Sequence, residues 1–170
     1  MEQTLGVVTE TDGGYQLAFE RTFKHPPAKV WRALTDPGEL RNWFPAVVDF
    51  DVTVGAKLTF APTDKQRAKF GLTDADAAQG ELIAADPPKL LEYTWGEDRL
   101  RWQLHDTADG GCRLEFTQTC PERDSAIVQG AGWHVGFEQI EALLDGTTPA
   151  YDPFERATEL AATYVQAHTP

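Results

Sequence analysis

Cysteine is scarce in this chain, which contains only Cys112 and Cys120. If the residues between them form one strand, the two lie about 26 Å apart at ~3.3 Å per residue. A disulfide needs Cα atoms within roughly 7 Å. The sequence therefore predicts two buried, unpaired thiols in a reduced compartment, and it excludes a disulfide-stapled scaffold.

Long apolar runs and an excess of basic residues are also missing. No segment approaches the ~18 apolar residues that a membrane-spanning helix needs. Residues 1–14 hold neither a basic region nor an apolar region of the signal-peptide kind, which predicts a cytoplasmic protein. The formal net charge is −12, from 15 Lys and Arg against 27 Asp and Glu. Such a surface repels phosphate backbones and anionic headgroups, so neither nucleic acid nor a membrane is expected as a partner.

The usual sequence signals for metals, phosphates and nucleophiles are absent as well. There is no H-x-x-x-H or C-x-x-C spacing, no P-loop, no G-x-G-x-x-G and no G-x-S-x-G. We therefore expect no metal, no cofactor and no assignable catalytic residue. His134 is the one histidine beside an apolar stripe, where it would serve as an acid or base, but a surface or boundary role is favoured.

What is present begins with a strand and two short helices. Residues 15–23 alternate apolar and polar side chains, which is typical of a half-buried strand, and residues 1–14 are expected to be a flexible lead. Residues 28–34 follow at helical spacing. Asp36 before Pro37 predicts the capped start of a second helix, which Pro45 prevents from continuing.

The middle of the chain reads as strands joined by short turns. Strands are expected at 47–52 and 57–62, followed by a long polar loop over 63–79. Four more runs with a period of two follow, over residues 80–85, 90–95, 100–107 and 112–120. Strands joined this way form an antiparallel meander, and their polar face is expected to meet water.

From about residue 125 to 145 the period changes to that of a helix. The apolar stripe of this segment comprises Gly132, Trp133, Gly136, Phe137, Ile140, Leu143 and Leu144. Gly146 suits the position just after the helix, and Asp152 to Glu155 forms a capping box that opens a final amphipathic helix. The predicted fold class is α+β, with an antiparallel sheet of about six to seven strands around the long helix. The predicted organisation is one domain over 15–146 with a helical extension over 147–170 packed on it.

Four segments together resemble the START/SRPBCC superfamily, and within it proteins similar to the activator of the heat-shock-protein-90 ATPase. They are His25–Asp36 with Pro37 through Phe44, Gly80 through Trp95, Gly110 through Leu114, and Gly132-Trp133 through Gly146. The resemblance covers about residues 15–146 and implies a helix-grip fold, a curved sheet around a long C-terminal helix. Residues 63–79 look like an enlarged loop, and 147–170 extend beyond the usual end. The superfamily shares no catalytic motif, so the resemblance transfers no catalytic residue.

The candidate site is a cavity between the sheet and the long helix, lined by inward-facing apolar side chains. These are Trp31, Tyr93, Trp95, Trp102, Phe116, Trp133, Phe137 and Ile140. Aromatic stripes are more often packed core. However, Gly132 and Gly136 cost a helix about 1 kcal/mol each relative to alanine and leave space, either for a pocket or for close-packed tryptophans.

Three functions follow. The first is binding of a small hydrophobic or aromatic ligand, with Tyr93 and the indole N–H groups available to its polar group. The second is a polyketide cyclase-like or hydrolase-like enzyme, disfavoured because Tyr93, Gln118 and His134 are the few polar candidates inside. The third is a chaperone-directed role like that of the ATPase activator, which rests on analogy alone.

Overall fold

The computed structural model describes residues 4–169. Its elements are β1 (Val7–Thr11), β2 (Gly14–Phe23), α1 (Pro27–Thr35), α2 (Pro37–Leu40), β3 (Lys57–Phe60), α3 (Asp64–Phe70), the 3₁₀ turn η1 (Asp74–Asp76), β4 (Ala78–Asp86), β5 (Leu90–Trp95), β6 (Asp98–Asp106), β7 (Cys112–Cys120), α4 (Arg123–Asp145) and α5 (Pro153–Ala167). None of these helices is both long and apolar enough to cross a membrane.

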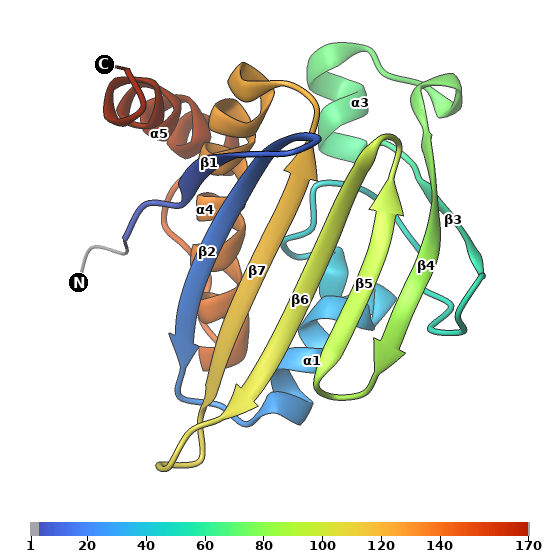
Figure 1. Ribbon diagram of the computed structural model, residues 1–170, viewed down its shortest axis with the longest axis vertical. Helices are drawn as coiled ribbons and strands as arrows, with labels where there is room; N and C mark the ends of the chain where they lie inside the picture. Colours follow the sequence, from blue (N-terminus) through green and yellow to red (C-terminus); the bar gives the residue numbers. More distant parts are fainter. Residues whose placement is uncertain (1–3, 170) are drawn as a thin grey trace.

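The seven strands form one antiparallel sheet in the order β1-β2-β7-β6-β5-β4-β3. Strands β4 to β7 are a meander, and the chain passes from β2 to the opposite edge through α1 and α2 (Figure 1). The register between β4 and β5 shifts between Leu82 and Ala84, which is the irregularity that a bulge introduces where a sheet bends. The α+β, helix-grip prediction is confirmed.

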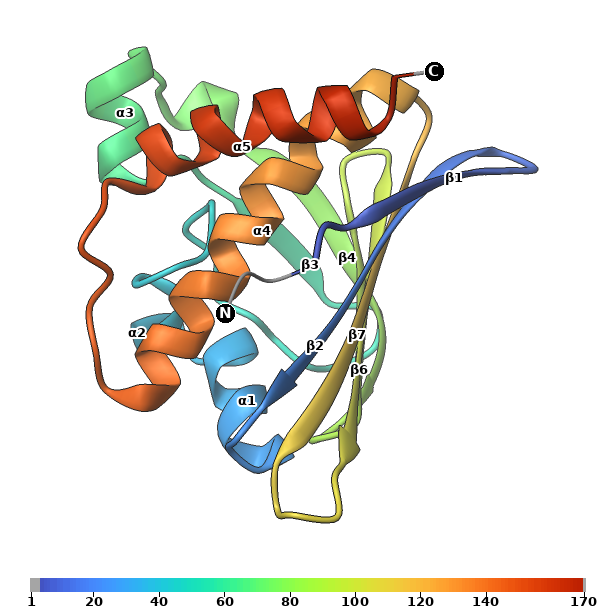
Figure 2. The ribbon, with the colours of Figure 1, turned by 90° about the vertical axis from the view of Figure 1, so that its left-hand side faces the viewer.

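All the helices lie on one side of the sheet, with α4 packed against its inner face and α5 crossing the N-terminal half of α4 (Figure 2). Strand β7 shows why: alternate residues from Cys112 to Cys120 are buried, while those between them are half-buried on the outer face. The two cysteines are free, as expected. Gly146 ends α4 in the left-handed conformation, and Asp152 caps α5 by accepting hydrogen bonds from two backbone N–H groups.

Both sheet edges depart from the sequence prediction. Val7–Thr11 is a strand that pairs with β2, in the segment expected to be a flexible lead; the first three residues of that lead lie outside the described part. β1 is mostly exposed, so its side chains show no strong alternation of apolar and polar residues. Its backbone pairing with β2 holds it in place. At the other edge, the strand expected at 47–52 is only a single bridge between Val47 and Ala61.

The segment expected to be a long loop contains α3 and η1. Thr63 forms a full capping box with Gln66 at the start of α3, and Thr73 forms a second one at η1. Neither helix buries a residue fully. The apolar periodicity that reveals helices was therefore absent, and only the capping pairs marked these two.

Candidate functional site

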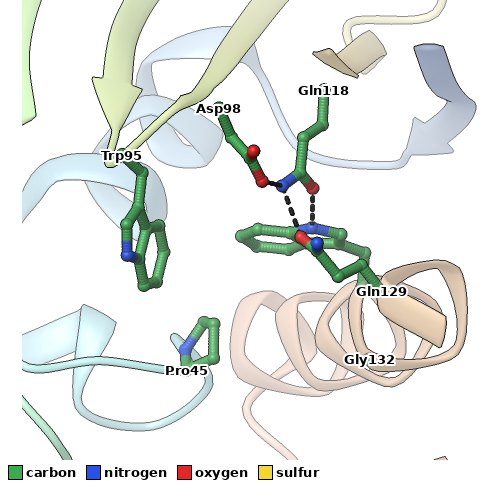
Figure 3. Close-up of a pocket in the computed structure, with 7 residues that line it drawn as sticks. Pro45, Trp95, Asp98, Gln118, Gln129 and Gly132 are labelled. Atoms are coloured by element: carbon green, nitrogen blue, oxygen red, sulfur yellow. Dashed lines mark hydrogen bonds between the residues drawn. The ribbon is translucent and has the colours of Figure 1, made fainter. Parts of the chain in front are cut away.

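A pocket of about 380 Å³ lies where the turn between β5 and β6 faces the first half of α4. We call it the indole pocket, because two tryptophans belong to it. It is lined by Pro45, Trp95, Asp98, Gln118, Gln129, Gly132 and Trp133. Trp95 and Pro45 face Gln129 and Gly132 across the space (Figure 3). Its volume lies in the usual range for small-molecule sites, about 300–1,000 Å³.

The apolar walls of the indole pocket are held by the aromatic core. The Trp95 ring stacks on Phe60, with centroids 4.2 Å apart and planes 7° from parallel, and it also stacks on Phe44 at 5.5 Å. The Trp133 ring contacts Phe44 from the helix side at 5.9 Å. These stacking contacts hold the Trp95 ring in place where it lines the pocket.

One end of the indole pocket is polar, and Gln118 organises it. This glutamine is 3% exposed. It accepts a hydrogen bond from the Trp133 indole N–H at 2.6 Å and donates to an Asp98 oxygen at 2.7 Å and to the Gln129 side chain. Figure 3 shows these bonds converging on the Gln118 amide. The network fixes the orientation of each polar group before any ligand arrives.

Asp98 carries the only ionisable side chain in the lining of the indole pocket. Burial raises the pKa of its carboxyl above the ordinary value, and the hydrogen bonds from Gln118 and Gln129 oppose that rise only in part. The carboxylate of Asp98 therefore gains from a further hydrogen-bond donor. Among residues 4–169, no group of three or more His, Cys, Asp or Glu side chains is arranged to hold a metal ion.

The two glycines on the apolar stripe of α4 have different roles. Gly132 is exposed, not on the buried stripe as expected; a Cβ on it would meet nothing within 4 Å, so it leaves open space beside the pocket that it lines. A Cβ on Gly136 would lie 3.5 Å from the ring of Trp43, so this glycine faces a packed tryptophan. Gly136 thus packs against a tryptophan, whereas no side chain packs against Gly132.

The eight predicted lining residues divide in the structure. Trp95 and Trp133 line the indole pocket. Trp31 lies half-buried on α1, outside the lining. The other five are fully buried in the packed core between sheet and helix, and they are Tyr93, Trp102, Phe116, Phe137 and Ile140. The space available to a ligand thus lies at one end of the aromatic layer.

Several of the polar groups expected to meet a ligand are used within the protein. The Trp102 indole N–H donates to the Tyr93 hydroxyl at 3.1 Å, and burial raises the pKa of that hydroxyl. His134 is 2% exposed, unlike the surface or boundary histidine that the sequence favours. Its Nδ1 lies 2.9 Å from the hydroxyl of Tyr164 on α5, and it does not line the indole pocket.

Sequence reasoning missed three lining residues: Pro45, Asp98 and Gln129. The signal for Asp98 was available, because it shares the inward side of β6 with Leu100 and Trp102 by the period of two. Gln129 precedes Trp133 by four residues, which places both on one face of α4. Pro45 carries no comparable signal, because its place depends on the irregular loop after α2.

The model of the family described as activator of Hsp90 ATPase homolog 1-like protein matches residues 24–145. The chain belongs to this family. Solved structures agree on the fold. A conserved protein of unknown function from Enterococcus faecalis is 18% identical, with a TM-score of 0.74 over 95% of this chain and 89% of the other. CalU16 from Micromonospora echinospora is 20% identical, with a TM-score of 0.70 over 99% and 98%. A protein from Mesorhizobium loti is 28% identical, with a TM-score of 0.65 over 79% and 99%.

Comparison with curated proteins gives no match. The family match contains every residue of the indole pocket, and it ends at residue 145, before α5. β1 and β2 also lie outside it. The indole pocket thus lies within the matched region, while β1, β2 and α5 are elements that the match does not include.

Proposed function

We propose that this protein binds a small aromatic ligand carrying a hydrogen-bond donor, such as a phenolic hydroxyl, in the indole pocket. The observation that supports this most is Gly132. It lies in the middle of a long helix at a cost of about 1 kcal/mol relative to alanine, yet a Cβ there would meet nothing within 4 Å. Gly132 is exposed and lines the pocket, so its missing side chain leaves room there for an occupant.

The walls of the indole pocket indicate the class of ligand. The Trp95 ring and Pro45 offer flat apolar contact, and Asp98 with Gln118 forms a polar end. A planar ring with one hydroxyl satisfies both, since the ring lies against the indole and the hydroxyl donates to the Asp98 carboxylate. The chaperone-directed role stays a prediction of the family resemblance.

The test uses 2-naphthol as the probe. Isothermal titration calorimetry should show saturable binding, and the indole N–H resonances of Trp95 and Trp133 should shift in ¹⁵N NMR spectra while that of Trp31 does not. Trp95→Ala should weaken binding by about threefold to tenfold, because one aromatic contact is removed. Trp31→Ala is the matched control and should bind like the parent. Absence of binding, or equal shifts at all the tryptophans, would rule out the proposal.

Asp98 favours a second candidate, acid–base catalysis on the bound molecule. A carboxyl that lies at the end of an apolar pocket, with a pKa raised by burial, is a candidate for proton transfer to or from a bound molecule. The slow exchange of the α-protons of 2-tetralone with D₂O, followed by NMR, tests it. The protein should accelerate exchange, and Asp98→Asn should abolish the acceleration. Acceleration that survives Asp98→Asn, or none in the parent, would exclude this role.

A further inference from the structure

A second cavity of about 500 Å³, the outer cavity, adjoins the indole pocket. It lies between the loop over residues 41–47, the start of α3, the middle of α4 and the start of α5. Pro45 and Gly132 line both spaces. Because Gly132 has no side chain, it leaves no barrier of its own between the two spaces. The two spaces thus share part of their lining, at Pro45 and Gly132.

The outer wall of this cavity is built from segments that the sequence marks as departures from the superfamily pattern. The Phe70 ring of α3 lies 5.8 Å from the Phe154 ring of α5, and the Lys69 ammonium sits 4.8 Å from the centroid of the same Phe154 ring. Figure 2 shows α3 beside the beginning of α5. Since the family match ends at residue 145, α5 adds a wall that the matched region does not supply.

The lining of the outer cavity carries a net charge opposite in sign to that of the whole protein. Arg41 and Lys65 both line the outer cavity, and in the described part of the chain neither forms an ion pair. One carboxylate, Asp64, also lines the cavity. The lining therefore carries a net positive charge on a protein whose net charge is −12. An anionic group is the complement of such a lining.

We propose that the outer cavity is a second compartment of the ligand site and holds the anionic end of an elongated ligand whose aromatic end occupies the indole pocket. This inference rests on the proposed function. It specifies the ligand class as an aromatic ring with a donor at one side and a flexible chain that ends in a carboxylate or a similar anion. The chain passes Gly132, and its charge lies near Arg41 and Lys65.

Three probes separate the parts of this proposal: 2-naphthol, 8-(6-hydroxynaphthalen-2-yl)octanoic acid, and the methyl ester of that acid. The acid should bind at least about tenfold more tightly than 2-naphthol, because the added chain buries apolar surface. The acid should also bind more tightly than its ester. Binding of 2-naphthol without any gain for the acid would overturn the second compartment and leave the proposed function standing. Failure of all three probes would overturn both.

Variants of the outer cavity locate the chain. Ala157→Phe fills the cavity from α5. It should weaken binding of the acid by about tenfold while leaving binding of 2-naphthol unchanged. Ala162→Phe is the control, because Ala162 is exposed on the same helix and lies outside the lining. The double variant Arg41→Gln/Lys65→Gln should weaken binding of the acid by about threefold to tenfold, since exposed charges contribute modestly. Binding of the ester should not change. Lys24→Gln, at an exposed lysine elsewhere, should change nothing. Equal losses for acid and 2-naphthol in Ala157→Phe would contradict the proposal.

Discussion

On one side of α4, Gly130 faces the ring of Tyr164, and an added Cβ would come within 2.7 Å of that ring. Two residues further along the helix, and therefore about 200° around it, Gly132 faces open space. Both glycines cost the helix about 1 kcal/mol relative to alanine. At Gly130 the cost is offset by close packing with α5, whereas at Gly132 the described structure shows nothing that offsets it.

We call the side of α4 that carries Gly130 the closed side, and the side that carries Gly132 the open side. On the closed side, Tyr164 makes further contacts. The Tyr164 hydroxyl accepts a hydrogen bond from the Gly6 backbone N–H at 2.7 Å and contacts His134 Nδ1 at 2.9 Å. Burial raises the pKa of this hydroxyl to about 12, so it keeps its proton at neutral pH. Tyr164 thus ties α5, α4 and the segment before β1 together. The comparison teaches that a helix glycine marks a site only where nothing else fills its space.

Removing the side chain that fills the closed side should have the largest effect. Tyr164→Ala should lower the free energy of unfolding by about 3–5 kcal/mol, because a fully buried aromatic ring is lost. Urea denaturation followed by circular dichroism measures this. Val165→Ala, at the exposed neighbour, should change stability by less than about 0.5 kcal/mol. Equal effects in the two variants would mean that α5 does not stabilise the domain.

Adding a methyl group on the closed side should have the next largest effect on the free energy of unfolding. Gly130→Ala should be destabilising, because overpacking costs about 1–3 kcal/mol and exceeds the gain in helix propensity. The contact is specific to Tyr164, so a double-mutant cycle between Gly130→Ala and Tyr164→Ala should show coupling: alanine at 130 should harm the parent and not the Tyr164→Ala background. Additive effects would place the clash elsewhere.

The same substitution on the open side should change the free energy of unfolding in the opposite direction. Gly132→Ala should raise the free energy of unfolding by about 1 kcal/mol, because alanine favours the helix and its Cβ meets no atom within 4 Å. The same denaturation experiment measures it beside Gly130→Ala. A loss of stability would show that the space at Gly132 is already filled in solution.

The sequence predicted the parts of the fold that depend on local periodicity. The alternation in 112–120 and the stripe of 125–145 place β7 and α4, because each segment buries one face against the other. β1 and α3 were missed, since they bury little and are held by backbone pairing or by caps. The lining of the indole pocket was found only in part. Whether an inward aromatic meets a cavity or a neighbour depends on non-local packing: Trp102 meets Phe116, whereas Trp95 meets the pocket.

The smallest expected effect on stability concerns the polar end of the open side. Burial raises the pKa of Asp98 in the folded protein, so the folded state holds this proton more tightly than the unfolded state does. Ionised Asp98 therefore lowers stability above its folded pKa, and this penalty disappears as the pH falls below the unfolded pKa. Asp98→Asn should stabilise the protein slightly at pH 7 and not at pH 3, in urea denaturations at both values.

The control is Asp106→Asn, which changes an exposed carboxylate at the other end of β6 and should not reproduce this pH dependence. Asp98→Asn should also weaken binding of 2-naphthol at pH 7, because an amide oxygen accepts a hydrogen bond less strongly than a carboxylate does. A residue that only packs would move stability and affinity in the same direction. Opposite signs at Asp98, higher stability with lower affinity, would show that its charge is retained for a ligand; lower stability at pH 7 would show instead that the carboxylate holds the network around Gln118 together.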